Sequence, residues 1–177
     1  FTSVNGTKKM AGTIGHVGAT SFFPSKNLGC YGDGGALFTN DDALAHTLRG
    51  IVNHGMYERY YHDVVGINSR LDSLQAAVLR IKLPLLDDWT NQRAQNAIRY
   101  TEMFNHCELH DAITSPKIDT RGRHVWNQYV IRVADGKRDA LREHLKASGV
   151  GTEIYYPVPL HLQKCFDNFG WKMGDLP

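Results

Sequence analysis

The sequence has few cysteines and no long hydrophobic run. Its three cysteines lie far apart and form no Cys-x-x-Cys pair: Cys30, Cys107 and Cys165. Neither a metal site nor a disulfide framework is therefore predicted, and reduced thiols are typical of a cytoplasmic protein. No apolar run approaches the roughly 20 residues that a membrane-spanning helix needs. We therefore expect a cytoplasmic protein that has no membrane partner.

A marked excess of one charge is also missing. The chain has 20 Lys and Arg against 18 Asp and Glu, and its basic residues cluster only in the pair Lys8-Lys9. Proteins that bind nucleic acid or anionic membranes gather positive charge on one surface, so the sequence predicts neither partner. With 42% hydrophobic and 21% charged residues, the composition is that of an ordinary globular protein.

Hydrophobic periodicity predicts alternating strands and helices. Residues 40–42 and Ser69 supply capping side chains for two helices, and Gly55 and Gly149 are expected to end helices. The predicted elements are, in chain order, strand-rich residues 13–23, a strand over 36–39, a helix over 42–52, a helix from 71 that bends at Pro84 and continues to about 106 (with Leu71, Leu74, Val78 and Ile81 on one apolar face), a strand over 126–133, a helix over 137–147 and a strand over 150–156. This order indicates an α/β protein that ends in a small strand–helix–strand unit.

The pattern with the most chemical content surrounds Lys26. This lysine follows an aromatic pair and Pro24, and it precedes a run with four glycines in seven residues, Gly29–Gly35. An amine that forms a Schiff base must be unprotonated part of the time, which a partly apolar environment favours. Nearby hydroxyls and backbone N–H groups suit a phosphate. By composition alone, however, a lysine is usually a solvated surface residue and a glycine run is usually a turn.

Ordered motifs along the chain add weight to the first interpretation. They are Thr20-Ser21-Phe22-Phe23-Pro24-Ser25-Lys26-Asn27-Leu28-Gly29 followed by Tyr31-Gly32-Asp33-Gly34-Gly35-Ala36, then Asn53-His54-Gly55, Gly66-Ile67-Asn68-Ser69-Arg70-Leu71-Asp72, Leu74-Gln75-Ala76-Ala77 and Tyr156-Pro157-Val158-Pro159-Leu160-His161. Together they resemble the sugar aminotransferases of the DegT/DnrJ/StrS type, over essentially the whole chain. These are fold-type-I enzymes that depend on pyridoxal 5'-phosphate (PLP). The resemblance implies an α/β fold with a mostly parallel sheet between helices, followed by a small α/β domain.

The resemblance also implies roles for three residues that would bind the cofactor. Lys26 matches the lysine that binds PLP as a Schiff base and later moves the proton. Ser21 matches the hydroxyl that hydrogen-bonds the cofactor phosphate. Asn68 matches the asparagine that reaches this phosphate from the neighbouring subunit of a homodimer. Locally, a turn asparagine that caps the next helix explains Asn68 about as well.

Three further residues are candidates for binding substrate. Arg70 lies where it could attract a donor carboxylate or a sugar pyrophosphate, but an ordinary salt bridge is an equal alternative. Tyr156 and His161 match the small-domain motif of the family and are expected to line the sugar pocket. For both, a packing or surface role is an equal alternative.

By the same comparison the chain divides into two parts. Residues 1–89 would complete the PLP-binding large domain, and residues 90–177 would form part of the small domain. In the family, an aspartate that pairs with the pyridine nitrogen of the cofactor precedes the lysine. No Asp or Glu occurs between Phe1 and Lys26, so we expect this chain to be an internal portion of a longer enzyme.

The implied reaction moves an amino group from an amino acid, by resemblance glutamate, to a nucleotide-linked keto-sugar. Two alternatives stay open. One is a PLP-dependent sugar dehydratase or lyase of the same fold, although in some of these dehydratases a histidine replaces the lysine at position 26. The other is a non-catalytic regulatory or binding relative, or a fragment that persists only as a folded module.

Overall fold

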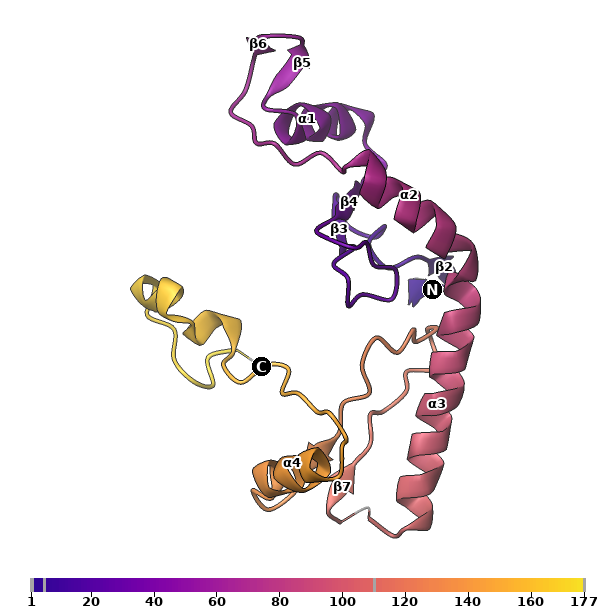
Figure 1. The fold of residues 1–177 in the computed structure, drawn as a ribbon. Coiled ribbons are helices and arrows are strands. Elements are labelled where there is room, and N and C mark those ends of the chain that lie inside the picture. Colours follow the sequence, from indigo (N-terminus) through magenta and orange to yellow (C-terminus); the bar gives the residue numbers. More distant parts are fainter. Residues whose placement is uncertain (1, 5, 110, 177) are drawn as a thin grey trace. The chain divides into compact units, whose positions relative to one another are not determined.

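The computed structural model describes residues 2–4, 6–109 and 111–176 (Figure 1). The chain forms two compact units, Phe1–Ile131 and Arg132–Pro177. The elements are β1 (Thr2–Val4), β2 (Thr7–Lys9), β3 (Gly18–Ser21), β4 (Gly35–Phe38), α1 (Asp42–Val52), β5 (Met56–Glu58), β6 (Tyr61–His62), α2 (Ser73–Lys82), the 3-10 helix η1 (Leu83–Leu85), α3 (Leu86–His106), β7 (Ile113–Thr114), β8 (Arg132–Val133), α4 (Arg138–Ala147), η2 (Leu160–Leu162) and η3 (Lys164–Phe169). Helices and short strands are mixed, as predicted for the α/β class. The predicted domain division between residues 89 and 90 stays a prediction for the complete protein.

The β3–β4 hairpin and helix α1 organise the start of the first unit. Strands β3 and β4 are antiparallel, with Gly18 opposite Phe38 and Ser21 opposite Gly35. The β1–β2 and β5–β6 pairs are antiparallel as well. The parallel order predicted for the main sheet therefore stays a prediction.

Helix α1 begins and ends where its sequence signals predict. The Asp41 Oδ1 atom accepts a hydrogen bond from the Leu44 N–H at 3.0 Å. Gly55 takes a left-handed conformation with φ 76°, and its N–H donates to the Gly50 carbonyl at 2.7 Å. Only a glycine adopts this conformation without strain, which explains why the helix is followed by a turn at this position.

The segment before α2 is bound to the end of α1 through its backbone. The Ser69 N–H donates to the Val52 carbonyl at 2.9 Å, so residues 67–69 continue along α1 instead of entering the next helix. Helix α2 begins only at Ser73, with Asp72 as its N-cap residue. The prediction that Ser69 caps this helix is therefore wrong.

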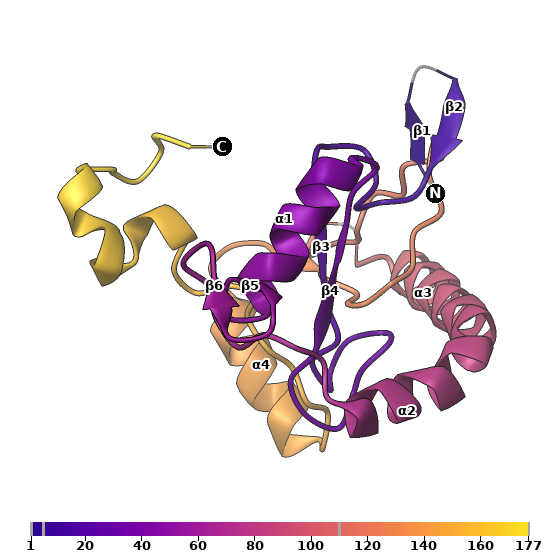
Figure 2. The same cartoon turned by 90° about the horizontal axis from the view of Figure 1, so that it is seen from above.

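Helices α2 and α3 form the long bent helix that the sequence predicts. Pro84 lies in η1, which joins them, and the helix axis changes direction there in both views (Figures 1 and 2). A proline ring removes one backbone donor and clashes with the preceding turn, which accounts for the bend. Neither this helix nor any other in the described ranges combines the length and the apolar character that a membrane crossing requires.

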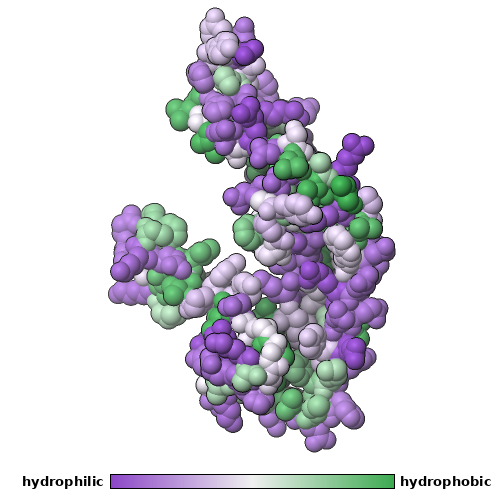
Figure 3. All heavy atoms as spheres, viewed as in Figure 1, coloured by the Kyte–Doolittle hydropathy of each residue, from purple (hydrophilic) through white to green (hydrophobic). Residues whose placement is uncertain are grey.

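The face of α2 that packs in this chain is not the predicted apolar face. Leu74 and Ile81 are 72% and 73% exposed, whereas Leu79 is buried at 9%. Gln75 and Lys82, on the same side as Leu79, are half-buried. Hydrophobic side chains consequently gather on the visible surface of α2 (Figure 3). The side that carries Gln75, Leu79 and Lys82 contacts the rest of the first unit, and of the predicted apolar face Val78 is half-buried.

Aromatic side chains make the core between α3 and the following segment. The Trp126 ring is 7% exposed, and its centroid lies 5.6 Å from that of Tyr129. Tyr129 also contacts Tyr100 of α3 at 5.2 Å between centroids, and its hydroxyl is 2.8 Å from Thr101 Oγ1. Each buried ring removes a large apolar area from water, so this cluster fixes residues 126–129 on α3.

The strand predicted over residues 126–133 is for the most part wrong. Trp126 has a φ of 50°, in the left-handed region that a strand residue does not adopt. Its carbonyl accepts a hydrogen bond from Arg93 Nη1 at 3.3 Å. Only Arg132–Val133 is a strand. The rings that pack on α3, those of Trp126 and Tyr129, are three residues apart, so the burial of this segment does not alternate as in a strand.

In the second unit, α4 is confirmed and the strand predicted over residues 150–156 is not formed. Helix α4 ends with Gly149 at φ 77°, and the Val150 N–H donates to the Leu145 carbonyl at 2.8 Å. Residues 150–156 contain no strand. A strand needs a neighbouring edge for its ladder, and none pairs with these residues in the described part of the unit.

An exposed ion pair in the first unit generates a testable pH dependence. Arg121 Nη2 lies 2.6 Å from Asp119 Oδ2, and the Arg121 N–H donates to Asp119 Oδ1 at 2.9 Å. Hydrogen bonds from the Arg121 side chain and then from its backbone lower the pKa of Asp119 from 3.8 to about 2. A carboxyl with a lowered pKa stabilises the folded state above its unfolded pKa, and this contribution is lost as the pH falls from 3.8 toward 2.

Nuclear magnetic resonance titration of the Asp119 carboxyl carbon measures this pKa directly. In Arg121→Gln the titration midpoint of Asp119 should rise toward 3.8, because the glutamine side chain is a weaker hydrogen-bond donor than arginine and carries no charge. Arg138→Gln is the matched control, since Arg138 pairs with Asp139 instead and should leave the Asp119 midpoint unchanged. An Asp119 midpoint that does not respond to Arg121→Gln would contradict the assignment.

Candidate active site

Lys26 lies in the loop between β3 and β4, residues 22–34, which we call the lysine loop. The Lys26 N–H donates to the Phe23 carbonyl at 2.9 Å, which closes a β-turn with Pro24 at its second position. The second position of a β-turn favours proline, because the proline ring fixes φ. The Lys26 side chain is exposed, and within residues 6–109 and 111–176 its Nζ has neither a hydrogen bond nor an ion pair. The amine is thus presented by a rigid turn and remains free to react.

Backbone hydrogen bonds fold the lysine loop back on itself. The Phe22 N–H donates to the Gly34 carbonyl at 2.7 Å, and the Cys30 N–H donates to the Phe22 carbonyl at 2.7 Å. Cys30 is 1% exposed. A Cβ at Gly34 would lie 2.7 Å from Cys30 Sγ, so the loop closes this tightly only with a glycine there.

Position 29 also requires a glycine, because a Cβ there would clash with backbone atoms. A Cβ on Gly29 would lie 2.6 Å from the Pro24 carbonyl oxygen and 2.9 Å from that of Phe23. Backbone atoms of a hydrogen-bonded turn cannot move aside as a flexible side chain can. The turn that carries Lys26 therefore packs directly on Gly29.

Helix α2 holds the glycine-rich half of the lysine loop. Gln75 Oε1 accepts hydrogen bonds from the Tyr31 N–H at 2.9 Å and from the Gly32 N–H at 3.2 Å. Lys82 Nζ donates to the Gly29 carbonyl at 2.7 Å and lies 5.1 Å from the centroid of the Tyr31 ring. We did not predict these roles from the sequence. The available signal was the spacing of Gln75 and Lys82, which places two polar side chains on one face two turns apart.

The other side of the lysine loop is held by Asn27, which directly follows Lys26. Asn27 Nδ2 donates to the Val125 carbonyl at 2.9 Å, while Asn27 Oδ1 is buried without a partner. Arg93 of α3 donates to the next two carbonyls, those of Trp126 and Asn127, at 3.3 and 3.4 Å. The contact between Asn27 and Val125 joins residues 98 positions apart in the chain, and no local sequence pattern reveals it.

Ser21 ends β3 and lies at the start of the lysine loop. Its Oγ accepts a hydrogen bond from the Phe23 N–H at 3.2 Å, and the residue is exposed. A hydroxyl that accepts one bond still has its proton to donate. The β3–β4 hairpin thus carries an exposed amine at Lys26 and a hydroxyl at Ser21 that can donate.

Asn68 and Arg70 line a groove of about 1180 Å³; Lys26 and Ser21 do not line it, but Thr20 of β3 and Asp33 of the lysine loop do. Arg70 Nε donates to Asn68 Oδ1 at 3.3 Å, so the two side chains are neighbours. Asn68 makes an isolated β-bridge with Asn53. Since Asp72 is the N-cap of α2, the alternative role of Asn68 as a helix cap is wrong.

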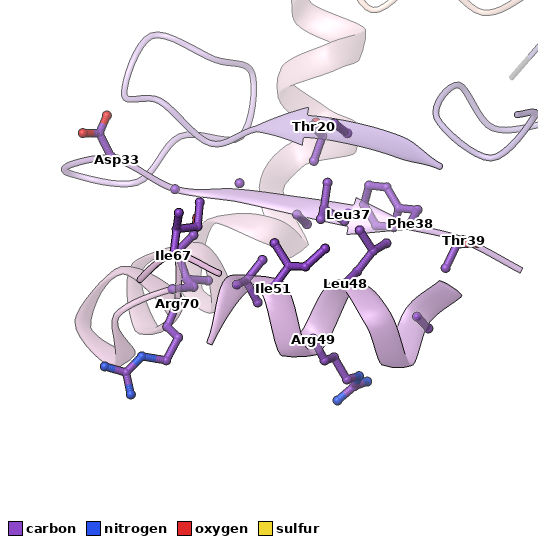
Figure 4. A pocket seen from close by; sticks show the side chains of 18 of the residues that line it. Thr20, Asp33, Leu37, Phe38, Thr39, Leu48, Arg49, Ile51, Ile67 and Arg70 are labelled. Atoms are coloured by element: carbon purple, nitrogen blue, oxygen red, sulfur yellow. The ribbon is translucent and has the colours of Figure 1, made fainter. Parts of the chain in front are cut away.

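The groove beside Asn68 and Arg70 is apolar where α1 faces β4. Figure 4 shows Leu48 and Ile51 of α1 pointing toward β4, where Leu37 lies, while the Arg49 guanidinium points away from the strands. Aliphatic side chains offer packing and no acid–base chemistry. The polar groups that line this region include the Asn68 amide, the Arg70 guanidinium and the carboxyl groups of Asp33 and Asp72.

Tyr156 and His161 belong to the second unit. Tyr156 is 73% exposed and contacts the Tyr155 ring edge to face, with 5.7 Å between centroids. His161 precedes Leu162 in η2, and its Nε2 is buried without a hydrogen-bond partner among the residues that the structure describes. Their place in a sugar pocket stays a prediction.

The expected partly apolar environment of Lys26 is not formed in this chain, where its side chain is exposed. The model of the DegT/DnrJ/EryC1/StrS aminotransferase family matches residues 2–177. The chain belongs to this family.

Two curated proteins show what the chain is similar to. The "Pleiotropic regulatory protein" of Geobacillus stearothermophilus is 49% identical, over 96% of this chain and 45% of that protein. The dTDP-3-amino-3,4,6-trideoxy-alpha-D-glucose transaminase of Streptomyces venezuelae is 43% identical, over 91% of this chain and 41% of that protein. The chain spans less than half the length of these relatives.

Solved structures agree with this assignment. The structure of DesV from S. venezuelae in complex with a ketimine intermediate superposes with a TM-score of 0.83 at 42% identity, over 91% of this chain and 42% of that one. That of NtdA from Bacillus subtilis with bound cofactor PMP superposes with a TM-score of 0.76 at 29% identity, over 84% of this chain and 35% of that one. The predicted family and fold class are thereby confirmed.

The packing of the Lys26 turn on Gly29 can be tested by adding one methyl group. Gly29→Ala should lower the free energy of unfolding of the full-length protein by about 1–3 kcal/mol, the usual cost of overpacking, measured by denaturant titration. Gly15→Ala is the control, because a Cβ there would meet nothing closer than 4.0 Å; it should change stability by less than about 0.5 kcal/mol. Equal losses in the two variants would contradict the close approach.

Proposed function

We propose that the full-length protein is a PLP-dependent aminotransferase that moves an amino group from glutamate to a nucleotide-linked keto-sugar, and that Lys26 carries the cofactor. The observation that carries this proposal is the free Lys26 amine, held on a turn that backbone hydrogen bonds and Gly29 fix. The 43% identical relative is named as a transaminase of a dTDP-linked amino-sugar, and the NtdA structure holds a PMP cofactor. We expect the enzyme to act in the cytoplasm, in the biosynthesis of amino-sugars.

The residues of the lysine loop fit the cofactor. PLP, when bound, withdraws electrons from the α-carbon of the amino donor. Lys26 Nζ supplies the amine that binds the PLP aldehyde, and after the donor has displaced it, the same nitrogen takes the proton from the α-carbon. In the second half of the reaction Lys26 Nζ returns a proton to the sugar carbon that receives the amino group. One flexible amine suffices because both proton transfers occur within its reach.

The Ser21 hydroxyl is proposed to donate to the cofactor phosphate. Its Oγ already accepts the Phe23 N–H, which orients its proton away from the loop backbone. Asn68 is proposed to donate to the same phosphate from the partner subunit of a homodimer. Its Oδ1 accepts from Arg70, which leaves the Asn68 Nδ2 protons as the available donors.

Three residues are proposed to bind the substrates. Arg70 presents an exposed guanidinium with no carboxylate partner among the described residues, which favours an anion from solution, either the donor carboxylate or the sugar pyrophosphate. Tyr156 offers an exposed ring and hydroxyl to a sugar. His161 has a buried ring nitrogen that still lacks a partner, and a sugar hydroxyl would satisfy it.

The dehydratase alternative differs in its product. A lyase releases ammonia and yields no amino-sugar, so product analysis with glutamate and a keto-sugar separates the two. The presence of Lys26 favours the transferase, because this amine can hold the cofactor between turnovers. The 49% identical relative is named a regulatory protein, and this name indicates no reaction. The alternative of a non-catalytic regulatory relative is tested by whether Lys26 binds PLP at all.

Borohydride reduction of the full-length protein loaded with PLP should fix the cofactor to Lys26, located by peptide mass spectrometry. Lys26→Ala should abolish both the adduct and amino-sugar formation, because no other amine occupies the loop. Lys137→Ala is the control, since this lysine is exposed in the second unit, and it should retain both. Undiminished sugar amination by Lys26→Ala would overturn the proposed function.

The position of Asn68 in the partner's site predicts complementation between subunits. Lys26→Ala and Asn68→Ala chains, each poorly active at limiting PLP, should recover roughly a quarter of wild-type activity when co-expressed, because half of random dimers are mixed and each has one intact site. Lys26→Ala with Ser21→Ala is the control: both defects lie in a chain's own site, so every mixed dimer has two damaged sites. Equal recovery in both pairs, or in neither, would contradict the assignment of Asn68 to the partner's site.

A further inference from the structure

Reaction at Lys26 demands accurate placement of one nitrogen atom. A displacement of about 1 Å in a catalytic group can cost about a hundredfold in rate. Lys26 itself is exposed, and its amine makes neither a hydrogen bond nor an ion pair to a described residue. Its position must therefore come from the backbone of the lysine loop, and in turn from whatever fixes that backbone.

Two side chains of α2 fix it from one side. Gln75 Oε1 binds two consecutive amides, those of Tyr31 and Gly32, at 2.9 and 3.2 Å. Two N–H groups that converge on one oxygen define the local orientation of both peptide planes. The Gln75 amide nitrogen makes no hydrogen bond to a described residue, so the acceptor oxygen alone does this work.

Lys82 acts at the point where the loop meets the turn. Its ammonium donates to the Gly29 carbonyl at 2.7 Å in a partly buried position, and Gly29 is the residue on which the Lys26 turn packs. Lys82 Nζ also lies 5.1 Å from the centroid of the Tyr31 ring, a favourable cation–π distance. A bond from a charged donor is stronger than one between neutral groups.

We propose that Gln75 and Lys82 are positioning residues that set the place of Lys26 by holding the backbone of residues 29–32 on α2. Neither touches the reacting atoms: Gln75 acts through the amides of the loop and Lys82 through the Gly29 carbonyl. This inference rests on the proposed role of Lys26. It adds that the polar face of α2 is part of the catalytic machinery, although nothing on it reacts.

The decisive comparison is between variants that keep the acceptor or donor and variants that remove it. Gln75→Leu and Lys82→Met should lower kcat about 10- to 100-fold with KM for the keto-sugar unchanged, since substrate contacts remain. Gln75→Glu keeps an oxygen that accepts both amides, and Lys82→Arg keeps a charged donor, so both should rescue most of kcat. Arg80→Met is the matched control, because Arg80 is exposed on the same helix and should retain wild-type kcat.

A second measurement does not depend on turnover. In the protein without cofactor, hydrogen exchange at the Tyr31 and Gly32 amides should be faster in Gln75→Leu than in the wild type and should stay slow in Gln75→Glu. Gln75→Asn, whose shorter side chain cannot reach the amides, should behave like Gln75→Leu and serves if the leucine variant does not fold. If folded Gln75→Asn and Lys82→Met match Arg80→Met in kcat and exchange, the positioning role is wrong.

The two proposals can fail separately. If Lys26→Ala keeps its activity and borohydride leaves no adduct on Lys26, the proposed function fails and these variants have no catalytic meaning. If Lys26→Ala is inactive but Gln75→Asn and Lys82→Met turn over normally, Lys26 is catalytic and is positioned without α2.

Discussion

The contact between the Lys26 turn and Gly29 is the constraint on which the candidate site depends. The turn can lie against the Gly29 backbone only because no Cβ intervenes, and Lys82 binds the carbonyl of the same residue. Phe22 closes the loop at both of its backbone groups. A long loop with so many glycines would be costly to order. These contacts offset that cost, and they leave the lysine side chain as the mobile part of a rigid frame.

Helix α2 has two functions that follow from its two faces. Its polar side, with Gln75 and Lys82, holds the lysine loop. Its leucine-rich side is exposed, with Leu74 at 72% and Ile81 at 73%. Apolar side chains in such number on one helix normally pack against protein, and the chain spans less than half the length of its relatives. The same helix thus ties the reactive loop to a surface suited to further packing.

The proposed site residues fall into groups that the fold treats differently. Lys26 and Ser21 are brought to one hairpin by the register of β3 and β4. Asn68 and Arg70 are neighbours along a groove that Thr20 and Asp33 of the hairpin also line. Tyr156 and His161 belong to a separate compact unit. That these residues form one site stays a prediction for the full-length protein.

The sequence by itself determined the helices, the bend at Pro84 and the family, because capping, proline and glycine effects act within a few residues and the motifs are contiguous; it also predicts Lys26 as the cofactor lysine. It misassigned residues 126–133 and 150–156, since strand patterns do not specify which neighbour provides the burial. Only the tertiary structure brought Asn27 to Val125 and Gln75 to Tyr31. Such contacts join residues far apart in the chain, and they form only where the packing of whole elements decides which polar groups meet.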